Sequence, residues 1–108
     1  MTDKKKIETL IQEELKSANE KYPLFHSPHE AFAVLKEEVE EANEEFADIF
    51  TSLFKMWSNV RNDIPLKDNA SKIYNIAINA ACEAIQVAAM AQKMLYGEEH
   101  NYETCKNL

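Results

Sequence analysis

The residues best suited to chemistry are glutamates that lie close together between positions 37 and 45. There are six of them: Glu37, Glu38, Glu40, Glu41, Glu44 and Glu45. In a helix that turns about 100° per residue, Glu38 and Glu45 lie at the border of an apolar stripe, with Glu41 slightly further out. The other three point away from that stripe. Carboxylates at i and i+3, such as Glu38 and Glu41, can bind one Mg²⁺ through oxygen ligands. The same run also suits a solvated face, because glutamate is a good helix former.

A second carboxylate, Glu83, lies inside the apolar stripe of a later helical segment, between Ala80 and Val87. Burial of an unpaired charge costs several kcal/mol, so Glu83 needs a cation, a metal, hydrogen-bond donors, a water-filled cleft or a proton. Gln86, at i+3, is a candidate neighbour, and Lys93 follows seven residues later on the same side. A structural ion pair and a functional carboxylate both account for this placement.

Three long helices are predicted to position these residues. The first has Thr2 as its cap and ends before Pro23, and the second begins at Pro28 after the capping box of Ser27 and Glu30. The second helix is either continuous or bent midway, and Pro65 lies beyond its end. The first helix is predicted at roughly residues 3–21 and the third at about 69–96. The second is predicted to run from residue 28 until Asn62, Asp63 and Pro65 interrupt the pattern.

The third helix is predicted to start at a cap supplied by Asp68 or Asn69 and to stop at Gly97. The tail from Glu98 onward is predicted to be loosely ordered. Only one glycine and three prolines occur in 108 residues, which leaves few sites for tight turns and favours an all-α domain covering residues 1–108. Three helices make an incomplete bundle, so we expect a homodimer or a higher homo-oligomer to complete the core.

Charge and composition bear on the partners. The net charge of −7 disfavours binding to nucleic acid, since such binding needs a basic surface. Cys82 and Cys105 form no metal-binding pattern, and no apolar stretch is expected to approach membrane-spanning length. A cytoplasmic protein without a membrane partner is therefore expected. His26 and His29 lack a third ligand and are more typical of surface histidines.

The segment Leu35-Lys36-Glu37-Glu38-Val39-Glu40-Glu41 resembles the LxEExxE signature of the MazG-like all-α nucleoside triphosphate pyrophosphohydrolases. Two further segments, at residues 27–35 and 83–91, are similar to parts of small MazG-like proteins, which are often phage-associated. This resemblance implies hydrolysis of a nucleoside triphosphate to a monophosphate and pyrophosphate with Mg²⁺, or with Mn²⁺. It also implies that Glu38, Glu41 and Glu83 are metal ligands, and that Glu37 is a further ligand or prepares the attacking water.

The chain departs from the family pattern at Gln86, where the classical second motif has an aspartate. The resemblance implies that Gln86 is a metal ligand, although an amide oxygen binds Mg²⁺ more weakly than a carboxylate does. An ExxD sequence does occur earlier, from Glu45 to Asp48, but it continues the same helix as Glu41. Lys93 is a candidate for binding a substrate phosphate, and the alternative is a solvated lysine on a helix flank.

A second hypothesis is a non-catalytic helical protein of the phage-associated type that keeps the fold and binds a partner. Its contact surface would be the acidic face or an exposed ridge formed by Phe50, Phe54 and Trp57. A ferritin-like di-iron protein would need Glu-x-x-His pairs, and none of the three histidines has a glutamate three residues before it.

Overall fold

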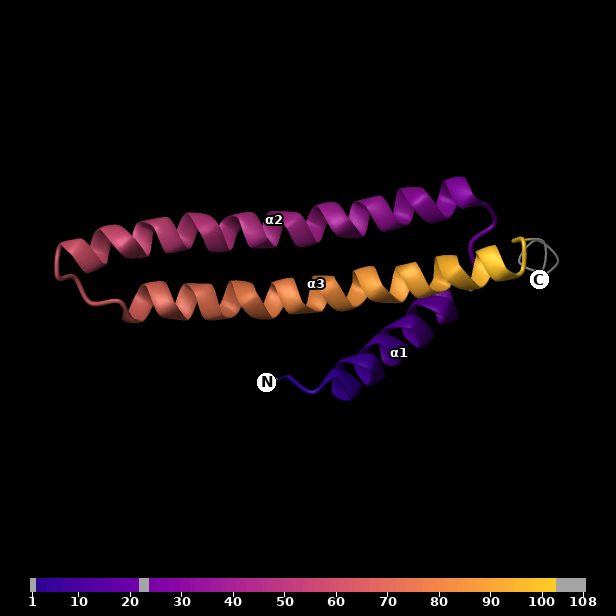
Figure 1. Cartoon of the computed structure of the whole chain (residues 1–108), viewed down its shortest axis with the longest axis horizontal. Coiled ribbons are helices and arrows are strands. Elements are labelled where there is room, and N and C mark those ends of the chain that lie inside the picture. The colour runs from indigo at the N-terminus through magenta and orange to yellow at the C-terminus, as the bar shows by residue number, and fades with distance from the viewer. Residues whose placement is uncertain (1, 22–23, 103–108) are drawn as a thin grey trace.

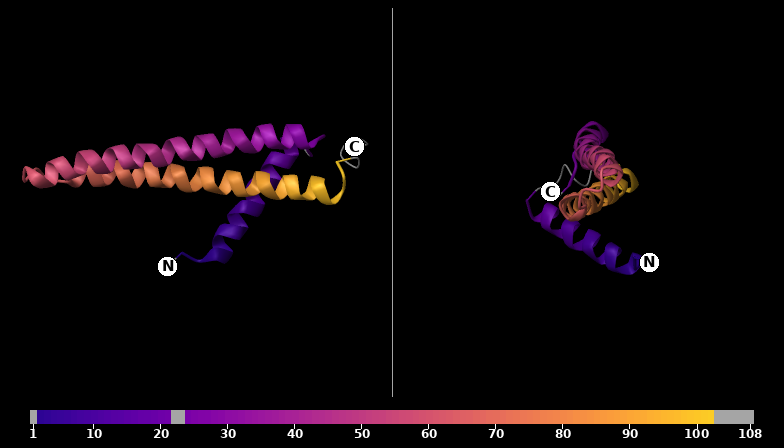
Figure 2. Two further views of the ribbon diagram at one scale, coloured as in Figure 1. Left: turned by 45° about the horizontal axis from the view of Figure 1, so that its top comes forward. Right: turned by 90° about the vertical axis from the view of Figure 1, so that its left-hand side faces the viewer.

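The protein is an all-α helical bundle, which confirms the predicted fold class. The computed structural model describes residues 2–21 and 24–102, and in these ranges the chain forms three α-helices and no strand. They are α1 (Lys4–Lys21), α2 (Pro28–Arg61) and α3 (Lys67–Glu99). Helices α2 and α3 form a long antiparallel hairpin, and α1 crosses one half of it obliquely, mainly against α3 (Figures 1 and 2). The chain extends over 63 × 27 × 21 Å.

The first two helix starts follow from local hydrogen bonds. At the start of α1, Asp3 acts as the cap in place of the predicted Thr2, because its Oδ1 accepts a hydrogen bond from the Lys5 amide at 2.9 Å. The cap predicted for α2 is confirmed: the Glu30 amide donates to Ser27 Oγ at 3.2 Å, and Pro28 occupies the first turn. The Glu30 carboxylate lies 3.1 Å from His26 Nδ1. Pro23, predicted to end α1, lies outside the described residues.

Helix α2 is continuous over 34 residues, which decides between the two alternatives left open by the sequence. The prediction that Asp68 or Asn69 caps α3 is wrong, since α3 begins at Lys67, directly after Leu66, without a side-chain cap. Asn69 instead accepts a hydrogen bond from Asn59 Nδ2 at 2.8 Å, and this bond joins α3 to α2 near their connection.

The end of α3 differs from the prediction at Gly97. This glycine does not stop the helix, which continues to Glu99. The Tyr102 ring packs directly over Gly97, and a Cβ built on Gly97 would lie 2.3 Å from Tyr102 Cε1. The chain turns back at Asn101 and Tyr102, which have φ values of 55° and 57°. Tyr102 is 4% exposed, so residues 98–102 are not loosely ordered as predicted, and residues 103–108 lie outside the described part.

The main hydrophobic core occupies the half of the hairpin that α1 crosses. Its buried members are Phe25, Ala31, Ala89, Met90 and Tyr102. Residues of α1 and α2 complete it: Ile11, Leu15, Ala18, Val34 and Leu35, together with Met94 of α3. The other half of the hairpin, residues 46–81, is here called the distal half. Among its residues only Ser52 and Ala80 are buried, and both are small.

Helix α3 contradicts the prediction that no apolar stretch approaches membrane-spanning length. It contains an 18-residue stretch that is long and apolar enough to cross a bilayer by length and composition alone. Only 17% of that stretch is buried inside the structure. The core helix of a helical bundle can meet the same criteria of length and composition.

Candidate functional site

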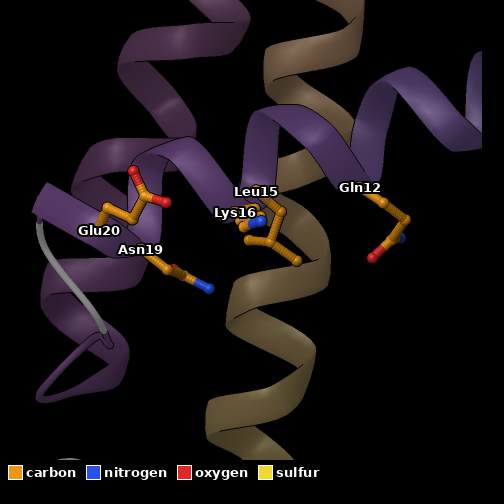
Figure 3. A pocket seen from close by; sticks show the side chains of 5 residues that line it. All are labelled: Gln12, Leu15, Lys16, Asn19 and Glu20. Atoms are coloured by element: carbon orange, nitrogen blue, oxygen red, sulfur yellow. The ribbon is translucent and has the colours of Figure 1, made fainter.

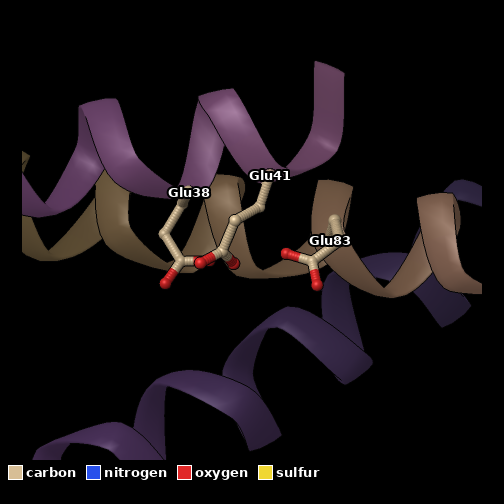
Figure 4. A group of neighbouring side chains, drawn as sticks. All are labelled: Glu38, Glu41 and Glu83. Carbon is tan, nitrogen blue, oxygen red and sulfur yellow. The ribbon is translucent and has the colours of Figure 1, made fainter. Parts of the chain in front are cut away.

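Three of the predicted ligands meet between α2 and α3. Glu38 and Glu41 lie one turn apart on α2, and Glu83 lies opposite them on α3. Each offers a carboxylate oxygen, and these oxygens all lie within 4.8 Å of one another (Figure 4). Glu38 and Glu83 are partly buried. The structure thus brings together residues that are more than forty positions apart in the sequence.

Gln86 lies on the same side of α3 and contacts two of these carboxylates. With its amide oriented to satisfy the hydrogen bonds, Nε2 donates to Glu38 Oε2 at 2.9 Å and to Glu83 Oε2 at 3.2 Å. In this arrangement Gln86 holds the two carboxylates in place across the helix pair. The predicted role of Gln86 as a ligand would require its amide to turn, so that the oxygen faces the cation.

The electrostatic environment disfavours full ionisation of the group. Partial burial, followed by the negative charges of Glu41 and Glu83, raises the pKa of Glu38. Partial burial also raises the pKa of Glu83, and the charge of Glu41 and a hydrogen bond to the Glu41 carboxyl group add to this effect. Such a hydrogen bond requires a proton on one of the two carboxyl groups. The group therefore favours either a bound proton or a cation.

The remaining predicted site residues lie outside this group of carboxylates. Glu37 is exposed and lies outside the group, although its charge contributes to the raised pKa of Glu38. Lys93 is 5% exposed, so it is not the solvated flank residue considered as the alternative, and its Nζ lies 4.7 Å from the centre of the Phe25 ring. His29 is exposed, as expected for a surface histidine.

Two further acidic residues act on the group, and sequence reasoning missed one of them, Glu14. The charge of Glu14, on α1, also raises the pKa of Glu38, and the charge of Glu45 raises that of Glu83. The position of Glu14 depends on how α1 crosses α3, where Gln12 Nε2 donates to Gln92 Oε1 at 2.7 Å. The signal for Glu45 was present, since the sequence placed it at the border of the apolar stripe.

A hollow of about 440 Å³ lies along α1, lined by Gln12, Leu15, Lys16, Asn19 and Glu20 (Figure 3). None of the three clustered glutamates lines it. The Oδ1 atom of Asn19 is buried and accepts no hydrogen bond within the described part of the chain.

Comparisons of the chain with protein-family models, with curated proteins and with solved structures find no match.

Proposed function

We propose that the protein is a Mg²⁺-dependent nucleoside triphosphate pyrophosphohydrolase. The observation that carries the proposal is the meeting of Glu38, Glu41 and Glu83 from two helices, with ligand oxygens within 4.8 Å. The resemblance of residues 35–41 to the LxEExxE signature supports it independently, because the signature names the same two glutamates of α2. A cytoplasmic location, where nucleotides are abundant, is part of the proposal.

The spacing of the carboxylates suits a Mg²⁺ ion after a small contraction. Mg²⁺ binds oxygen at about 2.1 Å, so two ligand atoms on opposite sides of one ion are about 4.2 Å apart. The three oxygens lie within 4.8 Å of one another, so only a small movement would bring them to this spacing. Glu38, Glu41 and Glu83 would hold the ion, and water and substrate phosphate oxygens would fill the remaining positions.

The proposed reaction is attack of water on the α-phosphorus. A bond forms between the water oxygen and this phosphorus, the bond to the bridging oxygen of the β-phosphate breaks, and pyrophosphate leaves. The bound cation would neutralise negative charge on the phosphates. Glu37, an exposed neighbour of the acidic group, is proposed as a further ligand or as the residue that prepares the attacking water.

The test is release of pyrophosphate from a panel of ribo- and deoxyribonucleoside triphosphates with Mg²⁺ or Mn²⁺. Glu38→Gln and Glu83→Gln are expected to lose at least about a hundredfold in activity, since each removes a ligand charge. Glu44→Gln is the matched control, because Glu44 is an exposed glutamate of the same helix. No release from any substrate, or equal loss in the control, would count against the proposal.

A second candidate function, binding of a protein partner without catalysis, is favoured by the exposed ridge on α2. Phe50, Phe54 and Trp57 are 70%, 79% and 57% exposed, as the sequence predicted. Gln86 in place of the aspartate of the family pattern points the same way. Absence of pyrophosphate release, together with no effect of Mg²⁺ on thermal stability, would favour this function over the hydrolase.

A further inference from the structure

A small polar hollow lies in the distal half of the hairpin, between α2 and the start of α3. Its volume is about 160 Å³, and the residues that line it all carry polar side chains: Ser52, Lys55, Asp68, Asn69 and Lys72. Pockets for drug-sized ligands measure about 300–1,000 Å³, so this hollow suits a small polar ligand. Ser52 lies about 16 Å along α2 from Glu41, which separates the hollow from the acidic group.

Two lysines line the hollow from different helices. Lys55 belongs to α2 and Lys72 belongs to α3. Within the described part of the chain neither lysine is paired with a carboxylate, whereas Lys36, elsewhere on α2, forms an ion pair with Glu40. Asp68 also lines the hollow, so the formal charge of the lining is +1. Unpaired cations on two sides of a hollow favour a negatively charged ligand.

Ser52 supplies a buried hydroxyl group to the hollow. This residue is 4% exposed, and it makes no hydrogen bond among the residues that the structure describes. The neighbouring Thr51 donates to the Ala47 carbonyl oxygen at 3.2 Å, as hydroxyl groups in helices often do, but Ser52 does not bond to its own helix in this way. A buried hydroxyl group without a partner is unfavourable, and a ligand in the hollow that accepts a hydrogen bond would satisfy it.

The start of α3 adds hydrogen-bond donors beside the hollow. Helix α3 begins at Lys67 without a side-chain cap, so no side chain accepts from the amides of its first turn. Asn69 accepts a hydrogen bond from Asn59 Nδ2 at 2.8 Å through its Oδ1 atom, which leaves its own Nδ2 as a donor. Helix N-termini carry a partial positive charge and bind anions such as phosphate. The helix end therefore favours the same kind of ligand as the two lysines.

The distal half is also where an anion meets less repulsion than elsewhere on this acidic chain. This half has four basic and three acidic side chains, which gives it a net charge of +1 and leaves −8 on the rest of the chain. We propose that the hollow is a binding site for a phosphate group, held by Lys55, Lys72 and Ser52 beside the start of α3. The bound phosphate would join α2 to α3 where few side chains are buried between them. This inference is independent of the proposed hydrolase activity, because it uses none of the clustered glutamates.

The test is calorimetric titration of the protein with inorganic phosphate and, separately, with pyrophosphate. EDTA is present, so that no divalent cation can hold a phosphate at the acidic group, and NaCl keeps the ionic strength constant at about 0.15 M. The wild-type protein is expected to bind at least one of the two probes with a Kd of about 1 mM or lower. Tighter binding of pyrophosphate would identify a diphosphate group as the ligand, and equal binding would identify a single phosphate group.

Substitutions in the lining are expected to change the affinity in both directions. Lys55→Gln and Lys72→Gln should each weaken binding at least about tenfold, since each removes a charge-assisted hydrogen bond. Ser52→Ala should weaken it about fivefold through loss of the hydroxyl group. Asp68→Asn should strengthen binding severalfold, because it removes a negative charge from the lining. A purely structural role of these residues would not produce such a gain.

The matched control is Lys67→Gln, since Lys67 is an exposed lysine at the start of α3 that does not line the hollow. It is expected to change the affinity less than about twofold, because salt screens charges outside the site. If Ser52→Ala fails to fold, as judged by circular dichroism, the variants of the exposed Lys55 and Lys72 still decide the question. No saturable binding of either probe, or an equal loss of affinity in Lys67→Gln, would overturn the proposal.

Discussion

Replacement of Glu83 by glutamine is expected to stabilise the protein at neutral pH when no divalent cation is present. The oxygens of Glu38, Glu41 and Glu83 lie within 4.8 Å, and burial and mutual repulsion raise the pKa of both Glu38 and Glu83. Glutamine keeps the size of the side chain and can still accept the hydrogen bond that Gln86 donates. Most substitutions at partly buried positions destabilise, so the expected sign is distinctive.

The size of the effect follows from the distance between the carboxylates. Two unit charges separated by 4.8 Å, the upper limit for these oxygens, repel by about 0.9 kcal/mol in water and by about 3.5 kcal/mol near a protein surface. The lower value is the better guide, because water reaches this group. With two neighbouring carboxylates, Glu83→Gln should therefore gain about 1–2 kcal/mol, which corresponds to a rise in Tm of about 4–16 °C for a chain of this size.

The stability that these two carboxyl groups contribute is expected to fall as the pH rises. The pKa values of Glu38 and Glu83 are raised on folding. Between the unfolded-state and the folded-state pKa values, the folded protein therefore binds more protons than the unfolded chain does. Their contribution to stability is fully present below the ordinary value of 4.5 and is lost as the pH rises through the folded-state pKa. The advantage of the variant should be largest near neutral pH and small near pH 4.5.

The assay is thermal unfolding followed by circular dichroism, with EDTA present and the protein concentration held constant. Glu44→Gln provides the control, since it removes the charge of an exposed glutamate on α2. Addition of Mg²⁺ should then raise the Tm of the wild type but not that of Glu83→Gln. A lower Tm for Glu83→Gln at neutral pH, or an equal rise in the control, would refute the electrostatic reasoning.

Two other substitutions test separate parts of the structure. Gln86→Asp replaces an amide that donates to two carboxylates with a fourth negative charge. It should therefore lower the stability of the metal-free protein and increase its Mg²⁺ affinity about tenfold, as measured by calorimetry. An unchanged Mg²⁺ affinity would contradict this placement of Gln86. Gly97→Ala should lower the free energy of unfolding by about 1–3 kcal/mol, since the added Cβ would lie 2.3 Å from Tyr102 Cε1. Thermal unfolding measures this loss, which should be much smaller when Tyr102 is also replaced by alanine. An equal loss in that background would show that Tyr102 is not the cause.

The sequence predicted the helices well and their exact ends less well. Helical periodicity and the cap at Ser27 locate α2 because these signals are local. Gly97 was misread because its role depends on Tyr102, which returns to pack over it after the chain turns. The predicted cap at Asn69 failed for the same reason, since its side chain bonds to Asn59 across the hairpin. Contacts made between elements are not encoded in the spacing of either element alone.

The residues of the candidate site were also predicted where the signal was local and missed where it depended on contacts between elements. Helical geometry indicated that Glu38 and Glu41 share a face, and the apolar surroundings of Glu83 indicated that this carboxylate needs a partner. The sequence did not show that Gln86 would present its nitrogen to two of these carboxylates, because that depends on the register of α2 against α3. Lys93 was also missed as a buried residue, since its burial depends on Phe25, which comes from the segment before α2.

The position of the acidic group relative to the two halves of the hairpin has a physical consequence. Glu38, Glu41 and Glu83 lie between the half that contains the core cluster and the distal half, where few side chains are buried. Without a cation, their repulsion opposes the close approach of α2 and α3 at this boundary. A cation bound there would offset this repulsion and hold the two helices together at the boundary, which stabilises the folded chain by linkage.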